Sequence, residues 1–233
     1  MLLSSIRGPM KLFLILAFPF LFSFSFSPMS QSIEYSSSKN AAQFLVQNDE
    51  ATNIAVELRV KARDMDENGE ESLVDTKEIS VFPPQMIIPP GEKRTIRVTY
   101  NLKDKITTEK SFRVYAEQLP LKVDAKTKDQ AGIKVLMQYI AALYVTPERA
   151  KSDLKLISIV GNGKELSLKF ENLGNKHQLI NNPVIKVAGK ELKIDDLRGV
   201  AGENVLAGKT RNFQVKSKII IPANSKFTFN IND

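Results

Sequence analysis

The sequence contains no cysteine and no tryptophan, and its only histidine is His177. Without cysteine the chain can form no disulfide, carry no lipid on a thiol and offer no thiolate to a metal or a substrate. One histidine rarely builds a catalytic site, and the sequence has no Gly-x-Ser-x-Gly turn leading into a helix. We therefore predict that the protein is not an enzyme and that it has no cofactor and no metal site.

Two other absences narrow the possible functions. No glycine-rich loop opens a helix, so nothing supports nucleotide binding. The acidic segment from Asp64 to Glu71 lacks the regular ligand spacing of a calcium loop. Its Asn68-Gly69 pair is typical of a hairpin turn, because Gly tolerates positive φ. We interpret this segment as a solvated hairpin tip.

The charge of the chain is moderate and evenly distributed. It has 33 Lys and Arg against 26 Asp and Glu, a formal net charge of +7. The basic residues do not form blocks, and no tryptophan is available for stacking on bases. This pattern predicts no nucleic-acid partner.

The N-terminus has the pattern of a signal peptide. Arg7 and Lys11 precede an apolar run over residues 12–26, and no acidic residue occurs before Glu34. The run holds about fifteen residues with Pro19 inside it, fewer than the roughly twenty that a membrane-spanning helix needs. A buried core helix is the alternative.

Export and removal of residues 1–30 are therefore expected. Ser27 and Ser30 satisfy the small-residue rule for cleavage, so we predict the cut after one of them. About two hundred residues would remain, enough for two ordinary domains that each bury a core. The mature chain is predicted to have no stable membrane anchor.

The remaining chain has the pattern of an all-β protein. Short segments rich in Val, Ile, Phe and Tyr alternate with polar turn clusters, and no long helical period occurs. The expected strands are 43–47, 54–62, 78–82, 94–101, 111–118, 133–145, 154–160, 166–172, 184–187, 212–216 and 226–231.

A polar segment divides these strands into two sets. Residues 146–152 (TPERAKS) contain Pro147 and suit an interdomain linker. Each half has the length and strand spacing of an immunoglobulin-like sandwich, so we predict two such domains in tandem, at residues 31–146 and 147–233. One larger sandwich spanning both halves is the alternative.

Several segments resemble a known family. Val81–Tyr100 (VFPPQMIIPPGEKRTIRVTY) combines Pro-Pro, a hydrophobic stretch, Pro-Gly and Arg-Val. Ser111–Leu121 (SFRVYAEQLPL) ends in an element of the Glu-x-x-Pro type, and Ile133–Pro147 (IKVLMQYIAALYVTP) is a long strand running into a proline. In the second half, Leu168–His177 (LKFENLGNKH) and Val205–Val215 (VLAGKTRNFQV) continue the pattern. In order and spacing these segments resemble the periplasmic pilus-assembly chaperones of the chaperone-usher pathway.

The resemblance implies a mechanism, a site and partners. Such chaperones lend the last strand of their first domain to a secreted pilus-like subunit and deliver it to an outer-membrane usher. The residues carried over to this chain are Ile133, Val135 and Met137, spaced two apart, with Tyr139 next on the same face. The alternative is that these residues face the protein's own core. Leu136, Ile140 and Ala142 make the other face nearly as apolar.

The sequence departs from the family pattern at the expected carboxylate anchor. In the best-known branch an Arg near the mature N-terminus and a Lys on the long strand grip the subunit's C-terminal carboxylate. The matching positions here are Ser32 and Ala142, and Thr146 stands before the linker proline, where a basic residue is frequent. Lys134 and Arg149 are the nearby candidates for a replacement.

Two other functions stay open. The first is an exported Ig-like structural or adhesive binding protein without chaperone activity. A fibre subunit would need an alternating N-terminal extension, and Gln31–Asn40 (QSIEYSSSKN) is too polar for that role. The second is a carbohydrate-active enzyme, which would need a pair of acids in a cleft. No such pair stands out in the sequence.

Overall fold

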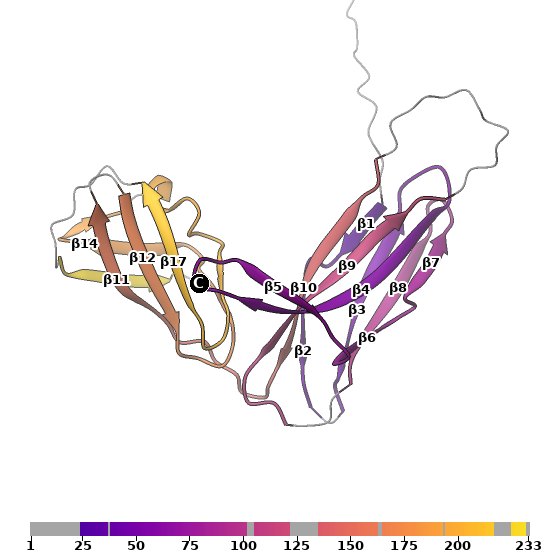
Figure 1. Ribbon diagram of the computed structural model, residues 1–233, viewed down its shortest axis with the longest axis horizontal. Helices are drawn as coiled ribbons and strands as arrows, with labels where there is room; N and C mark the ends of the chain where they lie inside the picture. Colours follow the sequence, from indigo (N-terminus) through magenta and orange to yellow (C-terminus); the bar gives the residue numbers. More distant parts are fainter. Residues whose placement is uncertain are drawn as a thin grey trace, which may run out of the picture.

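The computed structural model describes residues 24–231 except 37, 102–104, 122–134, 163–164, 193 and 217–224. These residues form β-strands and one short 3₁₀ helix, arranged in two units that meet at an angle (Figure 1). Among them, no helix is long and apolar enough to cross a membrane. The predicted all-β fold with two immunoglobulin-like sandwiches is confirmed.

The first unit, residues 24–146, is a sandwich of two sheets. Its strands are β1 (Phe24–Ser27), β2 (Ser30–Glu34), β3 (Ala41–Asn48), β4 (Ile54–Met65), β5 (Glu71–Asp75), β6 (Ile79–Phe82), β7 (Gln85–Ile88), β8 (Lys93–Tyr100), β9 (Lys110–Leu119) and β10 (Gln138–Thr146). One sheet has the order β1-β3-β8-β6. The other has the order β2-β10-β9-β4-β5, with β7 also paired to β4.

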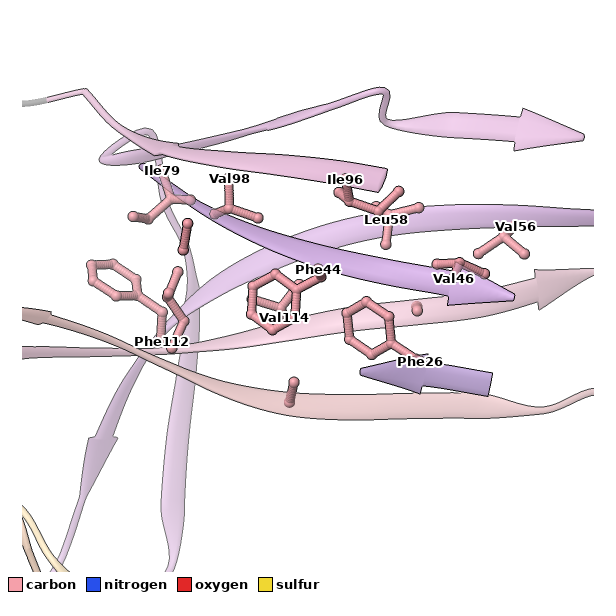
Figure 2. Close-up of a cluster of buried hydrophobic side chains, with 14 of the residues drawn as sticks. Phe26, Phe44, Val46, Val56, Leu58, Ile79, Ile96, Val98, Phe112 and Val114 are labelled. Atoms are coloured by element: carbon pink, nitrogen blue, oxygen red, sulfur yellow. The ribbon is translucent and has the colours of Figure 1, made fainter. Parts of the chain in front are cut away.

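The core of the first unit lies between these sheets. Along β9 the buried residues Phe112, Val114 and Ala116 alternate with outward-facing residues, as a strand with one covered face requires. Figure 2 shows side chains from both sheets meeting in this core, among them Phe26 and Phe44. Their rings stack at a centroid distance of 5.2 Å.

The second unit, residues 154–231, has its own core. Its elements are β11 (Leu154–Asn162), β12 (Glu165–Asn172), β13 (Gln178–Leu179), β14 (Pro183–Val187), β15 (Lys190–Glu191), a 3₁₀ helix (Ile194–Leu197), β16 (Asn204–Val205), β17 (Thr210–Lys216) and β18 (Phe227–Ile231). The sheets β11-β12-β17 and β15-β14-β18 enclose the core, and β13 pairs with β16. The two cores are separate, so the alternative of one larger sandwich is wrong.

Two differences from the predicted strands matter for function. The long strand was expected to begin at Ile133, but β10 begins at Gln138, and Val135–Met137 precede it without strand structure. The second difference concerns β1, which lies inside the predicted signal peptide. Phe24 and Phe26 of this strand are 1% and 3% exposed. They are part of the first core.

Candidate partner-binding edge

Strand β10 has one edge that is only half covered. On one side it pairs with β9 from Gln138 to Val145. On the other side β2 runs parallel to it, but only over Ala142–Thr146. The outer backbone edge of Gln138–Ala141 therefore has no strand partner among the described residues. An unpaired edge of this kind can accept a strand from another chain.

The predicted binding residues lie at this end of β10. Ile133 is outside the described residues. Val135 is 69% exposed, and Met137 and Tyr139 are partly buried against the first core. Ala141 continues the same face and is fully buried in that core. The surroundings of this face therefore change along the chain: Val135 is exposed to solvent, and Ala141 is buried in the core.

The opposite face of β10 is apolar as well, as the sequence indicated. Leu136 and Ile140 are 42% and 40% exposed on this face. Ala142 and Tyr144 follow, and they pack with Met65 and with Leu206 of the second unit in a small apolar cluster. Both faces of β10 are thus covered near the linker and open toward its start.

Tyr139 is held in place by β1. Its hydroxyl donates a hydrogen bond to the carbonyl oxygen of Phe24 at 2.7 Å. The two rings meet edge to face, with centroids 4.9 Å apart. Met29, just before β2, accepts a hydrogen bond from the Ala142 amide. The chain segment from β1 to β2 therefore contacts β10 at Tyr139 and at Ala142.

A charged cluster lies across the sheet from Ala142, the position where the family's lysine was expected. Ala142 is the cross-strand partner of Arg113 on β9. The guanidinium groups of Arg113 and Arg63 both bind the carboxylate of Glu71, at 2.9 Å and 2.8 Å. Burial acts to raise the pKa of Glu71, but the two arginines outweigh it and hold this pKa below its ordinary value.

Sequence reasoning missed this cluster. The alternation of β9 places Arg113 on the outer face, but only the cross-strand register shows that it lies beside Ala142. Of the two replacement candidates, Lys134 is outside the described residues. Arg149 is exposed in the linker turn with a φ of 58°.

The hairpin of β4 and β5 bridges the two units. It was expected to have a solvated tip, but it rests on β17 and the turn before it (Figure 1). Lys209 donates to the carboxylate of Asp64 at 2.8 Å. The backbone N–H of Asn212 donates a hydrogen bond to the Glu67 carbonyl oxygen at 2.6 Å. The solvated-tip interpretation is therefore wrong: these acids bind the second unit.

The only histidine is a contact between the units. His177 stacks on Tyr144 at 3.7 Å between ring centroids, and its Nδ1 lies 2.6 Å from the buried carboxylate of Glu109. Thr146 donates to the same carboxylate at 2.7 Å. Among the described residues, no group of three or more His, Asp or Glu side chains is placed to hold a metal.

The fold and the comparisons together show the family to which the chain belongs. Two immunoglobulin-like sandwiches in tandem, joined through the last strand of the first, define it as a two-domain β-sandwich protein. Residues 25–151, more than half of the chain, match the family described as "Pili and flagellar-assembly chaperone, PapD N-terminal domain". The chain belongs to this family. No curated protein matched it.

Solved structures share the two-domain fold at low sequence identity. One is a chaperone–tip adhesin pre-assembly complex, CsuC-CsuE, of archaic Csu pili of Acinetobacter baumannii, with 19% identity, a TM-score of 0.59 and coverage of 82% of this chain and 89% of that one. The class 5 fimbriae chaperone CfaA has 20% identity, a TM-score of 0.57 and coverage of 90% and 100%. A complex of the Salmonella enterica pilin SafA with its chaperone SafB has 18% identity, a TM-score of 0.60 and coverage of 84% of this chain and 85% of that one.

Proposed function

We propose that this protein binds secreted pilus-type subunits in the periplasm by donor-strand complementation through β10 and delivers them to an outer-membrane usher. Its membership of the pilus-assembly chaperone family supports this role. Two of the similar structures contain a chaperone with a pilin or a tip adhesin subunit. The observation that carries the proposal is the uncovered edge of β10 over Gln138–Ala141.

Strand addition at this edge has a clear physical basis. A subunit strand would complete the hydrogen bonds of the open edge, and alternate side chains would enter apolar pockets in the subunit. Ile133, Val135, Met137 and Tyr139 are the proposed donor residues. Because Met137 and Tyr139 pack partly on the chaperone's own core, Val135 is the described residue that is freest to enter a partner.

The domain organisation is part of the proposal. The first unit supplies the donor strand, and the linker follows directly after Thr146, where β10 ends. We place the border between the domains at residues 146 and 147. The second unit is tied to the first by the β4–β5 hairpin, by His177 and by the apolar cluster around Tyr144.

The test is a comparison of two matched charge substitutions. Val135→Arg places a charge at a proposed donor position just before β10. Val74→Arg places one at a similarly exposed site, 61% exposed, on β5 at the far edge of the sheet that contains β10. Both variants should fold, since neither residue is buried. We expect Val135→Arg to abolish recovery of secreted periplasmic subunits in a pull-down, and Val74→Arg to retain it.

Two outcomes would contradict the proposal. If the folded Val135→Arg variant still recovered subunits at the wild-type level, donation of the segment that runs from Val135 into β10 would be wrong. If wild-type protein captured no secreted subunit at all, a chaperone role would be wrong. The protein would then be an exported binding module.

A further inference from the structure

The strand β1 lies where the sequence predicted a segment to be discarded. Cleavage after Ser27 or Ser30 would remove all four residues of β1, Phe24–Ser27. Yet this strand pairs with β3 along its whole length, from Phe24 opposite Asn48 to Ser27 opposite Leu45. It is the edge strand of the first sheet.

The burial of β1 shows that the fold needs it. Its four residues alternate between buried and exposed, with Phe24 and Phe26 facing the core and Ser25 and Ser27 facing outward. Phe26 stacks on Phe44, which is 1% exposed, and sits opposite Val46, which is fully buried. Removing β1 would open this part of the core to water and leave β3 with an unpaired edge.

The family match agrees with this assignment independently. It begins at residue 25, inside β1, so the family's N-terminal domain includes this strand. The strand also supports the proposed donor strand, because Phe24 accepts the hydrogen bond of Tyr139 and packs on its ring. A chain that began at residue 28 or 31 would lose both contacts.

We propose that the leader is cut at the bond between Ser23 and Phe24, so that the mature chain begins with β1. This inference rests on the proposed export. Hydrolysis of that bond consumes one water molecule: the carbonyl of Ser23 becomes a carboxylate, and the nitrogen of Phe24 becomes the new α-amino group. An export-linked endopeptidase that requires a small residue before the cut would perform the reaction.

The choice of Ser23 follows from the residues before β1. Only Ala17 and Ser23 are small residues within the apolar run upstream of Phe24. A cut after Ala17 would leave an apolar stretch of five residues after Lys11, shorter than the roughly seven that a leader needs. A cut after Ser23 leaves residues 12–22, which fall within the usual range. Leu21, third before the cut, is larger than the usual residue there.

Intact mass of the exported protein tests the site directly. The full-length gene is expressed in a Gram-negative host, and the periplasmic fraction is analysed. We expect the mass of residues 24–233. A mature chain beginning at residue 28 or 31 would overturn the inference while leaving the export proposal in place. A full-length chain retained in the cytoplasm would overturn both.

Three arginine substitutions sharpen the test. Ser23→Arg should block processing and cause the uncut precursor to accumulate, because a long side chain cannot occupy the position before the cut. Ser27→Arg and Ser30→Arg change exposed positions on either side of Pro28 and should be processed like the wild type. Normal processing of Ser23→Arg together with a block in either of the other two variants would assign the cut to the later serine instead.

Discussion

The hydroxyl of Tyr139 donates a hydrogen bond to the carbonyl oxygen of Phe24, 2.7 Å away, and so ties β10 to β1 in the opposite sheet. This contact joins the proposed donor strand to the strand that the sequence had assigned to the leader. It lies next to Ala141, where the same face of β10 is fully buried in the first core.

The first prediction concerns this hydrogen bond. Tyr139→Phe keeps the ring contact with Phe24 but leaves the Phe24 carbonyl without its donor. We expect a loss of about 1 kcal/mol in the free energy of unfolding, measured with urea. Tyr115→Phe is the matched control, since the Tyr115 hydroxyl has no hydrogen-bond partner among the described residues. An equal loss in both variants would show that the Tyr139 bond contributes nothing specific.

The second prediction concerns the core position of β1. Phe26→Ala removes a ring that is 3% exposed and stacked on Phe44, so the mature protein should lose about 3–5 kcal/mol of stability. Phe82→Ala removes a ring that is 73% exposed, and its effect should stay within about 0.5 kcal/mol. If purified mature protein were unaffected by Phe26→Ala, residue 26 would not be part of the folded chain.

The third prediction concerns the docking of the β4–β5 hairpin. A Cβ atom at Gly69 would clash with Nη2 of Arg211, whose side chain is held by a 2.9 Å hydrogen bond to the Asn204 carbonyl oxygen. Gly69→Ala should therefore cost about 1–3 kcal/mol more than Gly91→Ala. Gly91 also has a positive φ but has nothing within 4 Å of the added atom. Equal unfolding free energies for the two variants would mean that the hairpin does not rest on Arg211.

The fourth prediction concerns acid stability. Because the pKa of Glu71 is lower in the folded chain than in the unfolded one, its stabilising effect is complete above the unfolded value of about 4.3. It is lost as the pH falls through the folded-state pKa. Between about pH 6 and about pH 3, the wild type should lose more unfolding free energy than Glu71→Gln, as measured with urea. Equal losses in the two proteins would show that the Glu71 carboxylate does not contribute to the pH dependence of stability.

Most of the strands could be predicted because their hydrophobic alternation is local. The segments predicted at residues 43–47, 54–62, 94–101 and 111–118 correspond to β3, β4, β8 and β9. The strand β1 could not be distinguished in this way. Its two phenylalanines continue the apolar run of the leader without a break, and the leader pattern accounts for the same residues.

The site was less predictable because it depends on pairing over long sequence distances. The spacing of Val135, Met137 and Tyr139 indicates a shared face, but it does not tell whether that face meets a partner or the core. The part of β10 that is open becomes clear only from its pairing with β2, which covers Ala142–Thr146 and leaves the residues before Ala142 uncovered. The acidic tip of the β4–β5 hairpin looked solvated because its basic partners, Lys209 and Lys169, lie more than a hundred residues away in the sequence.

The central claim is that a partner strand adds to the open edge of β10. Amide hydrogen exchange of the protein, alone and bound to a secreted subunit recovered with it, tests this most directly. Alternate amides of Gln138–Ala141 that point away from β9 should exchange rapidly in the free protein and become strongly protected in the complex. Exchange at these amides that is unchanged by a bound subunit would contradict the claim.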